Sequence, residues 1–513
     1  MIEVNTNRPI NSSPLAPGKP DLMRTTTRRY FLQQGALVGG ALALGSRAFG
    51  ATSANEQVNL GVIGLGWRGG QLIDAFGRVP GVKIAAICDP DSSLVDEWSA
   101  KVPDAQTFSD LRGLLDLAEI DAVAIATCNH WHCLAALWAM EAGKHVYVEK
   151  PLCNAHWEGV QVVNATDRYK KICQIGTQQR SAPFLGELKQ LLHEEKLLGP
   201  IEWVRVNRFG VRASIGKREA PLAPPATLDY NLWLGPAEDQ PIYREKWHYD
   251  WHWDWNTGAG EMGNWGVHIL DDVRNNVFQD SVAFPQRAIA AGGRFGWHDA
   301  GNTPNVHFAL LDTGTIPVVI ALTNLPDKPG SESAPKCPGP GSGYIAYCEG
   351  GRLEGQRGKA QFFDSEGKLI KEFSGNDGMG AHQVNFIEAI RNNSPDSLNG
   401  PVNEGHHSTA WCTLANYAYR AAQETATSDS TDPSVLVEQL GADARLSAAA
   451  ATILEQLSQV AANNQQGIDA LELTLGPVLT FDSASEQFTG EHAEVANQYL
   501  RTLGRGEFVV KEV

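Results

Sequence analysis

A glycine-rich turn between an apolar segment and a helix is the feature that most constrains the fold of this chain. Residues 58–63 are apolar, Gly64-x-Gly66-x-x-Gly69 follows at once, and a helical pattern continues from there. Glycines also mark ordinary turns, so the motif alone is a weak signal. Its position after a strand and at the start of a helix is typical of the first turn of a dinucleotide-binding domain.

An acidic residue lies where such a domain contacts the ribose of its cofactor. A second apolar segment, residues 82–88, completes a strand-helix-strand unit and ends at Asp89. Gly64 and Gly66 would let the backbone approach a pyrophosphate, whose charge would lie at the helix N-terminus. Asp89 would accept hydrogen bonds from the ribose hydroxyls and repel a 2'-phosphate, so the sequence favours NAD over NADP.

Strands and helices keep alternating as far as residue 178. We expect strands over 121–127, 145–149 and 172–177, and helices over 132–142 and 154–169. This alternation predicts a parallel sheet of about five or six strands. Ligands of such sheets bind beyond the carboxyl ends of the strands, which places residues 127–132 and 149–151 at the cofactor crevice.

After residue 178 the pattern changes to β-rich runs joined by long irregular stretches. The runs are 201–208, 287–291, 306–311 and 316–322, and helical patterns occur near 383–393, 404–423 and 434–461. Strands without intervening helices predict mostly antiparallel pairing. The sequence therefore predicts an α/β protein with an N-terminal Rossmann domain containing a doubly wound parallel sheet (55–178), a substrate-binding α/β domain with a large, mostly antiparallel open sheet (179–395), and a C-terminal helical segment and tail packing on the other domains (396–513).

Four ordered motifs resemble those of one family. They are the glycine turn, Ala126-Thr127-Cys128-Asn129-His130, Glu149-Lys150-Pro151, and Gly258-x-Gly260-x-x-x-Asn264-x-x-x-His268-x-x-Asp271. From about residue 57 to residue 425 the chain resembles the Gfo/Idh/MocA family of glucose-fructose oxidoreductase and inositol dehydrogenase. The resemblance implies a Rossmann domain followed by an α/β domain whose open sheet supports the substrate pocket and often an oligomer interface. It is specific for the family and poorly specific for the substrate.

The resemblance implies that Lys150 and His268 face the nicotinamide, and the chemistry of alcohol oxidation agrees. Hydride loss from a secondary alcohol leaves a carbonyl only if the hydroxyl proton departs too, so we expect the His268 imidazole to act as the base. Lys150 can stabilise the developing alkoxide, although without the cofactor context it would be interpreted as a surface lysine paired with Glu149. Asn264 lies four residues before His268, on the same helical face, where family members often carry Asp. Its amide can orient substrate hydroxyls but cannot take a proton.

Cofactor contacts are expected in the glycine turn and at the ends of the following strands. The residues are Gly64, Gly66, Trp67, Arg68, Gly69, Asp89, Thr127, Asn129, His132, Glu149 and Lys150. His132 also suits the start of the following helix, so a structural role is an equal alternative for it.

Aromatic and polar residues cluster before the last motif, in a composition suited to a sugar ring. Apolar C–H faces of a sugar stack on aromatic rings while its hydroxyls form hydrogen bonds. Five tryptophans lie between residues 247 and 265, and at least two of them should belong to the core or to a subunit contact. Expected substrate contacts are Gln178, Trp251, Trp253, Asn264, Trp265, His268 and Asp271. Asp271 would either orient the imidazole or be an ordinary helix-surface carboxylate.

The alternation His248-x-Asp250-x-His252-x-Asp254 could present metal ligands on one strand face. Hydride transfer needs no metal, and the sequence contains no second ligand cluster, so we predict no metal site. The formal net charge of −17 also disfavours a nucleic-acid partner, because an acidic chain repels phosphate backbones.

The first fifty residues have the pattern of an export signal. Arg28 and Arg29 precede a mildly apolar run of about ten residues, which is shorter than a spanning helix requires. We predict a twin-arginine signal over residues 1–50, a periplasmic location, and no membrane span in the mature protein. This route carries folded proteins, which predicts a tightly held cofactor. The eight cysteines are dispersed without a CxxC pair, and we expect free thiols.

Three functions stay open. The leading hypothesis is an exported oxidoreductase that acts on a secondary hydroxyl of a sugar, cyclitol or sugar derivative with tightly bound NAD. Some relatives look like NAD-dependent glycosidases, which oxidise a ring hydroxyl transiently, eliminate the aglycone, add water and reduce the ring again. The third hypothesis is a non-catalytic exported sugar-binding protein, which Asn264 in place of Asp would permit. Because an open antiparallel sheet often pairs with a copy of itself, we expect a homo-oligomer, either a dimer or a tetramer.

Overall fold

The computed structural model describes residues 57–425, 444–465, 473 and 475–513. The predicted export signal, residues 1–50, lies outside the described residues. Within the described ranges, no helix is both long enough and apolar enough to cross a membrane. The eight cysteines are all described and are free thiols, as predicted.

The first sheet is parallel, with six strands in the order β3-β2-β1-β4-β5-β6. Its strands are β1 (Val58–Ile63), β2 (Val82–Cys88), β3 (Gln106–Phe108), β4 (Ala122–Ile125), β5 (His145–Val148) and β6 (Cys173–Ile175). The connecting helices are α2 (Trp67–Gly77), α3 (Ser92–Ser99), α4 (Leu111–Leu115), α5 (His132–Glu141) and α6 (His156–Tyr169). The strand order reverses direction between β1 and β4, which defines a doubly wound sheet and confirms the predicted Rossmann domain.

The second sheet has ten strands in the order β14-β13-β12-β11-β7-β10-β9-β8-β15-β16. They are β7 (Ile201–Phe209), β8 (Arg287–Gly293), β9 (Val306–Asp312), β10 (Val318–Thr323), β11 (Ser342–Cys348), β12 (Gly351–Gln356), β13 (Lys359–Asp364), β14 (Leu369–Ser374), β15 (Leu479–Asp482) and β16 (Gln487–Thr489). Strands β7 and β10 pair in parallel, and the other pairs are antiparallel. The predicted large, mostly antiparallel sheet is therefore confirmed.

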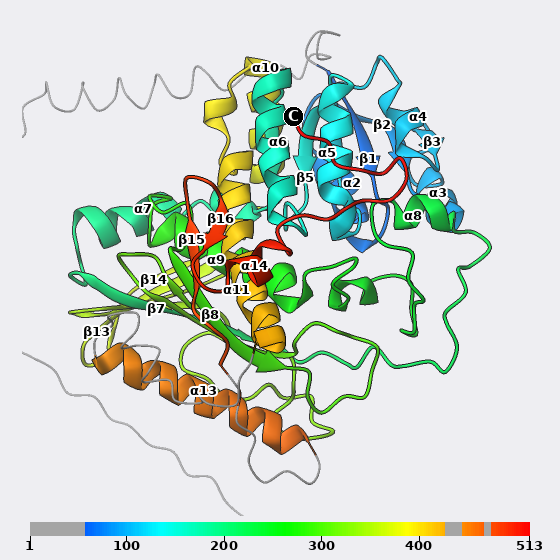
Figure 1. Ribbon diagram of the computed structural model, residues 1–513. Coiled ribbons are helices and arrows are strands. Elements are labelled where there is room, and N and C mark those ends of the chain that lie inside the picture. The colour runs from blue at the N-terminus through cyan, green and yellow to red at the C-terminus, as the bar shows by residue number, and fades with distance from the viewer. Residues whose placement is uncertain (1–56, 426–443, 466–472, 474) are drawn as a thin grey trace, which may run out of the picture. The chain divides into compact units, whose positions relative to one another are not determined.

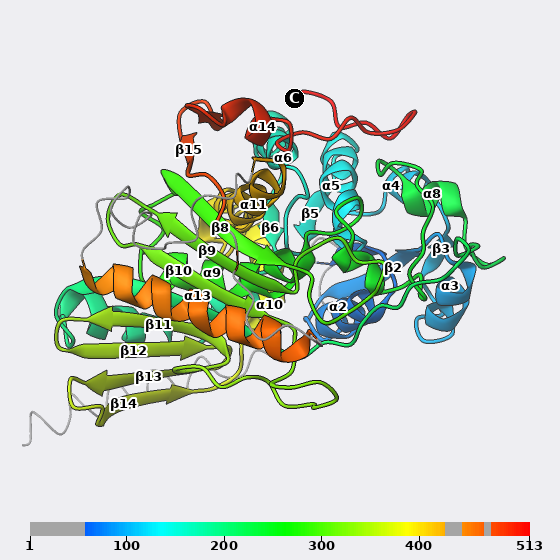
Figure 2. The same ribbon diagram turned by 60° about the horizontal axis from the view of Figure 1, so that its bottom comes forward.

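Helices cover both faces of this second sheet. Helices α9 (Val267–Asn276) and α11 (Val402–Thr425) pack on one face, where they form a large apolar core with the strands. Helix α13 (Ala444–Asn464) lies across the other face, as Figures 1 and 2 show. Leu457 and its apolar neighbours on α13 pack there against residues of β8, β9 and β10. A helix from the same chain therefore covers this face of the sheet over these three strands, so they do not form an uncovered face that could pair with a copy of the protein.

The C-terminal segment adds strands to the sheet edge as well as helices. Strand β15 pairs with β8, and α14 (Ala493–Asn497) follows the β15–β16 hairpin. The end of the chain then packs on the Rossmann domain, where the Phe508 ring meets the Trp131 ring edge-on with centroids 5.5 Å apart. Such short strands leave little periodicity in the sequence, so only helices were expected here.

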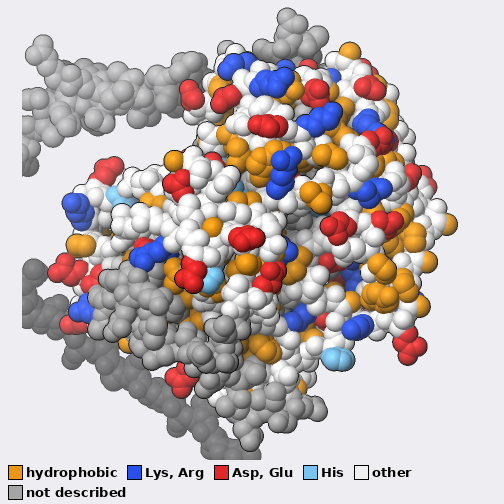
Figure 3. All heavy atoms as spheres, viewed as in Figure 1, with side chains coloured by type: hydrophobic (Ala, Val, Ile, Leu, Met, Phe, Trp, Pro, Cys, Tyr) orange, Lys and Arg blue, Asp and Glu red, His pale blue; other side chains and the backbone are white. Residues whose placement is uncertain are grey.

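Four further α-helices of the described residues complete the fold. They are α7 (Leu185–Lys189), α8 (Tyr230–Leu234), α10 (Ala381–Asn392) and the α14 already described. A π-helical turn, Met262–Gly266, leads directly into α9. On the face drawn in Figure 3, Lys and Arg side chains are scattered among Asp and Glu side chains. A mixed surface of this kind offers a phosphate backbone no continuous positive track on that face.

Candidate active site

A cavity of about 780 Å³ lies beyond the carboxyl ends of the parallel strands and is lined by both domains. Fifteen predicted site residues line it: Gly64, Gly66, Trp67, Arg68, Asp89, Thr127, Asn129, His132, Glu149, Lys150, Gln178, Trp251, Asn264, Trp265 and His268. Gly69, Trp253 and Asp271 are predicted site residues that do not belong to the lining. Residues far apart in the sequence thus converge on one hollow where a doubly wound sheet binds its ligand.

The glycine turn is shaped by steric limits at two positions and is open at the third. Gly64 has φ +89°, and a Cβ atom there would lie 2.6 Å from the carbonyl oxygen of Ala126. A Cβ atom on Gly69 would lie 1.8 Å from the carbonyl oxygen of Gly64, so Gly69 permits close packing of helix on strand. A Cβ atom on Gly66 would meet nothing within 4 Å. Gly66 therefore faces the space that a pyrophosphate would take at the start of α2.

Asp89 is buried at the end of β2, and backbone groups hold both of its oxygens. Leu65 N–H donates to Oδ2 at 2.7 Å, and Asp91 N–H donates to Oδ1 at 2.9 Å. Burial raises the pKa of Asp89 to about 6, and these two hydrogen bonds partly oppose that shift. The two backbone hydrogen bonds thus hold the carboxylate in a fixed orientation on the cavity wall.

Glu149 forms its ion pair with Arg68 from the glycine turn. Arg68 Nε and Nη2 both lie 2.7 Å from Glu149 Oε1, and Gln178 Nε2 donates to the same oxygen at 3.3 Å. The interpretation of Lys150 as a surface lysine paired with Glu149 is therefore wrong, because Arg68 occupies this carboxylate and Lys150 lies in the cavity.

Lys150 lies at the end of β5 and extends toward the second domain. Its Nζ donates to the main-chain oxygen of Asn264 at 2.8 Å. Burial lowers the pKa of Lys150 to about 8, while the nearby Glu149 opposes that shift. An ammonium near its pKa at neutral pH can donate a hydrogen bond and can also exchange a proton.

His268 lies in the first turn of α9 and its side chain is almost fully buried. Burial and the Lys150 cation hold the pKa of His268 well below its ordinary value. The imidazole is therefore neutral near pH 7, which is the form that accepts a proton. The Trp265 ring meets it edge-on, with centroids 6.0 Å apart.

The π-helical turn places Asn264 differently from a regular α-helix. Its Nδ2 donates to Glu261 Oε2 at 3.2 Å, and Glu261 is fully buried. Glu261 Oε1 in turn accepts from Arg208 Nε at 2.7 Å and from Arg212 Nη2 at 3.1 Å. Asn264 and His268 still share the cavity wall although a π turn, and not a regular α-helical turn, precedes α9.

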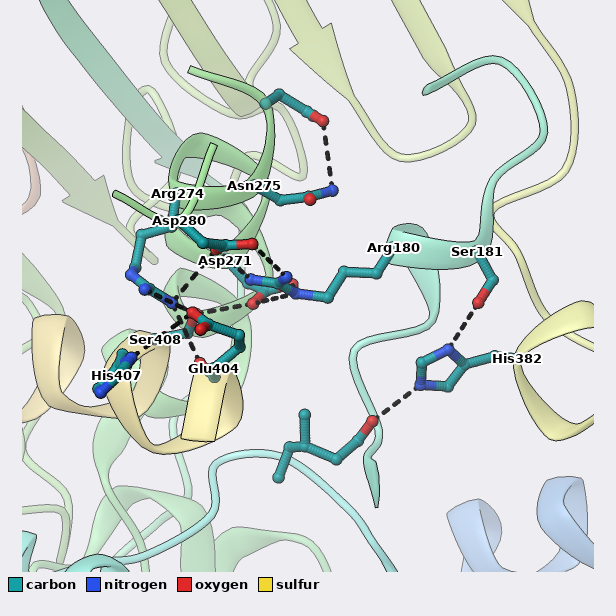
Figure 4. A network of polar contacts seen from close by, with 12 residues as sticks. Arg180, Ser181, Asp271, Arg274, Asn275, Asp280, His382, Glu404, His407 and Ser408 are labelled. Atoms are coloured by element: carbon teal, nitrogen blue, oxygen red, sulfur yellow. Dashed lines mark hydrogen bonds and ion pairs between the residues drawn. The ribbon is translucent and has the colours of Figure 1, made fainter. Parts of the chain in front are cut away.

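Asp271 does not orient His268, contrary to the prediction. It is almost completely buried, and it accepts from Arg180 Nε at 2.8 and 2.9 Å and from Ser408 Oγ at 2.7 Å (Figure 4). Arg180 also pairs with Asp280, and Arg274 pairs with Glu404 beside them. A buried guanidinium requires carboxylate partners, and Asp271 is one of the two that Arg180 has. Asp271 is also not a helix-surface carboxylate, which was the alternative.

The tryptophans divide between the cavity and the core. Trp251 stacks on His252 with centroids 3.6 Å apart, and both line the cavity. Trp253 is buried beneath the Arg212 guanidinium instead, at 5.7 Å, and does not line the cavity. The Trp247 ring packs edge-on against Trp233 in a small apolar cluster. The structure therefore places two of the five, Trp247 and Trp253, in the core.

The structure also shows where His132 lies and which groups His248 and His252 contact. His132 begins α5 and lines the cavity as well, with Nδ1 2.7 Å from the Pro151 oxygen. His248 Nε2 lies 3.0 Å from Asp91 Oδ2, and His252 Nδ1 lies 2.6 Å from the Tyr249 oxygen. His248 thus pairs with a carboxylate outside the alternating segment that suggested metal ligands, and His252 pairs with a main-chain oxygen within that segment.

Tyr249, Arg212, Arg357 and Asp377 are among the cavity residues that were not predicted. Arg357 pairs with Asp377, and Arg212 Nη1 donates to the Tyr249 hydroxyl at 3.1 Å. Tyr249 has φ +69° and ψ −46°, and Asp250 N–H donates to the His248 oxygen at 2.9 Å across it. This is a γ-turn of the strained hand. Only the aromatic composition around Tyr249 could have indicated it; no motif marks the other three.

The fold and this cavity define a two-domain protein with an NAD-binding Rossmann domain and a second α/β domain. Residues 58–177 match the family model of the Gfo/Idh/MocA oxidoreductases for the NAD-binding Rossmann fold, and residues 189–293 match the model for their C-terminal alpha/beta domain. Over these two ranges the chain is similar to the Gfo/Idh/MocA oxidoreductases.

Similar curated proteins carry glycosidase names. An alpha-N-acetylgalactosaminidase of Shewanella oneidensis is 28% identical over 222 residues, which are 37% of this chain and 48% of that protein. A glycosyl hydrolase family 109 protein of Solibacter usitatus is 34% identical over 170 residues, 29% of this chain and 39% of that protein. The matches thus span less than half the length of these relatives.

Solved structures share the fold at low identity. The WlbA dehydrogenase from Bordetella pertussis, solved with NADH and UDP-GlcNAcA, has a TM-score of 0.52 and 18% identity, covering 71% of this chain and 97% of that one. Levoglucosan dehydrogenase, solved with NADH, has a TM-score of 0.52 and 16% identity, with the coverage 71% and 97%. At such identities the likeness is one of fold.

Proposed function

We propose that this protein moves a hydride between NAD and the carbon that bears a secondary hydroxyl in a carbohydrate bound in the cavity, and that twin-arginine export delivers the protein to the periplasm with its cofactor bound. The observation that carries the proposal is the convergence of Lys150 and His268 on one cavity with the glycine turn and Asp89. Bound NAD would supply the hydride acceptor. The open space at Gly66 and the fixed Asp89 carboxylate suit its pyrophosphate and ribose.

The two polar side chains divide the proton chemistry between them. The neutral His268 imidazole would take the hydroxyl proton as the C–H bond is lost. The Lys150 ammonium would donate to the same oxygen and stabilise negative charge as it develops. Asn264 would hold a neighbouring hydroxyl, because its amide cannot take a proton and Glu261 already fixes its Nδ2.

A second candidate, supported by the names of the curated relatives, is redox-neutral glycoside cleavage. It begins with the same oxidation of a ring hydroxyl, and the ring is reduced again after the aglycone leaves and water adds. This cleavage releases the sugar from its aglycone without net oxidation, whereas net oxidation yields a lactone or keto sugar. The same cavity residues serve both reactions, so the products separate the two candidates.

The first experiment is to denature the purified signal-less protein and assay the supernatant for NAD and NADH. About one nicotinamide cofactor per chain is expected. Turnover is then screened with free sugars, sugar pairs and aryl glycosides, with product redox state as the readout. His268→Ala should keep the cofactor and lose hydride transfer. Unchanged turnover in that variant would exclude His268 as the base.

Export is tested on the full chain in a bacterial host with a twin-arginine translocase. We expect the protein in the periplasmic fraction, and replacement of both Arg28 and Arg29 by Lys should retain it in the cytoplasm. A periplasmic double-Lys variant would overturn the proposed export route.

A further inference from the structure

Two histidines and a glutamate from three distant parts of the chain meet outside the cavity. His156 is the first residue of α6, His406 lies in α11, and Glu486 lies in the turn of the β15–β16 hairpin. His156 Nε2 is 2.6 Å and His406 Nε2 is 2.9 Å from the same atom, Glu486 Oε2. The three ligand atoms lie within 4.8 Å of one another. None of these residues has a part in the proposed reaction.

The two imidazoles are buried and only half satisfied. Their side chains are 1% and 3% exposed, and the Nδ1 atom of each has no hydrogen-bond partner among the described residues. The hydrogen bond made by one ring nitrogen normally decides which tautomer a histidine adopts. Here Glu486 Oε2 accepts from both rings, so each hydrogen lies on Nε2 in the structure; a cation at this point would take the Nε2 lone pairs, and each ring would then carry its hydrogen on Nδ1.

The surroundings combine an apolar shell with one solvent-facing side. The rings of Phe284 and Phe481 meet the His156 ring edge-on, with centroids 5.6 and 5.4 Å away. The Glu486 side chain is 28% exposed, which leaves a path from solvent to the cluster. Glu486 also has φ +51°, a left-handed conformation that is costly for a residue other than glycine. The hairpin turn accepts that conformation at the residue that brings its carboxylate to the two imidazoles.

We propose that His156, His406 and Glu486 bind a divalent transition-metal ion, with Zn²⁺ as the best match. Two imidazole nitrogens and one carboxylate oxygen form a ligand set that zinc accepts, with water in the fourth position. Tetrahedral bonds of about 2.0–2.1 Å separate ligand atoms by about 3.3 Å, so the carboxylate must move back by less than about 1 Å from its hydrogen-bonding position. The exposed turn around Glu486 can make this movement. The ion would fasten the C-terminal hairpin to α6 and α11, far along the chain from either helix.

Metal content of the wild-type protein is the direct test. Untagged protein is purified without added metal, its zinc is measured by mass spectrometry, and the EDTA-treated protein is titrated with ZnCl₂ while the melting temperature is followed. We expect about one zinc per chain, or a saturable rise in the melting temperature at micromolar zinc, since a ligand that binds only the native state stabilises it. A protein that contains no zinc and shows no rise in melting temperature with added zinc would overturn the proposal.

Variants assign the site to these residues. Glu486→Gln keeps a hydrogen-bond acceptor and removes the charge, and it should weaken zinc binding by more than about tenfold. His406→Gln should do the same. His407→Gln is the matched control, because the adjacent His407 imidazole faces Glu404 at 3.5 Å and not Glu486. Co²⁺ in the wild-type protein should give the visible absorption of a tetrahedral site. Wild-type zinc affinity in Glu486→Gln would overturn the assignment.

Discussion

The Lys150 ammonium donates to the main-chain carbonyl of Asn264 at 2.8 Å, and this bond joins the Rossmann domain to the turn that precedes the helix of the candidate base, His268. Lys150 follows β5, and Asn264 lies in the π-helical turn directly before α9. The contact fixes the ammonium beside His268 without using a charged partner. Because Glu149 is occupied by Arg68, the Lys150 cation would be available to a substrate oxygen in the proposed reaction.

The pH dependence of turnover should show an alkaline limb from Lys150. Burial lowers its pKa to about 8, so the donating ammonium is lost as pH rises through that value. The pKa of His268 is held well below 6.5, so its base form persists through the neutral range. Lys150→Arg stays protonated at every accessible pH. It should lower kcat and remove the alkaline limb from kcat/KM measured between about pH 5 and 10. An unmoved limb would assign it to another group.

The choice of NAD over NADP should depend on Asp89. Asp89→Ala removes the carboxylate that would repel a 2'-phosphate, so the ratio of the NADP and NAD dissociation constants should fall by about tenfold or more. The change also leaves Leu65 N–H and Asp91 N–H without their acceptor, which should cost about 1–3 kcal/mol of stability. Fluorescence titration with NADH and NADPH measures the ratio. An unaltered preference would show that the ribose is recognised by other residues.

Asp271→Asn tests whether this residue stabilises the fold or takes part in catalysis. It leaves the buried Arg180 with one carboxylate, so we expect a loss of about 3–5 kcal/mol in the free energy of unfolding. Asp280→Asn is the control, because Asp280 also pairs with Arg180 but is 23% exposed, and it should cost only about 1 kcal/mol. Urea unfolding measures both. At a temperature where Asp271→Asn is folded, kcat should stay near wild type; a selective loss of kcat would restore the predicted role beside His268.

Sequence patterns predicted what local periodicity encodes. The glycine turn, Asp89 and the strand-helix alternation each occupy a short stretch, and they were sufficient to predict the Rossmann sheet and part of the cavity lining. Long-range pairings were missed. Arg180 and Asp271 are 91 residues apart, and no local pattern near Asp271 indicates that it pairs with a buried guanidinium. The sequence does not predict the γ-turn at Tyr249 either, because tyrosine rarely adopts the positive φ that this turn requires.

The apolar face beneath α13 should associate if the helix is displaced. Leu457 is fully buried between α13 and the sheet, and Leu457→Asp would place an unpaired charge there. We expect α13 to undock and the uncovered strands to drive self-association, seen as a larger mass by light scattering after gel filtration. Gln459→Asp, on the exposed side of the same helix, is the control and should keep the wild-type mass. Equal masses for both variants would mean that α13 does not cover a surface that self-associates.

The backbone conformation of Tyr249, which lines the cavity, should lower the stability of the folded protein. Its γ-turn, with φ +69°, carries strain of about 1–3 kcal/mol that glycine avoids. Because the residue is 43% exposed, truncation removes little buried area. Tyr249→Gly should therefore be neutral or up to about 1 kcal/mol more stable, in spite of the entropy that glycine adds to the unfolded chain. Tyr243→Gly is the matched control, since Tyr243 is 39% exposed and has no positive φ. It should lose about 1 kcal/mol in thermal or urea unfolding. If Tyr249→Gly lost as much stability as Tyr243→Gly, the γ-turn would store no strain. A raised KM with normal stability in Tyr249→Gly would assign the ring to substrate binding.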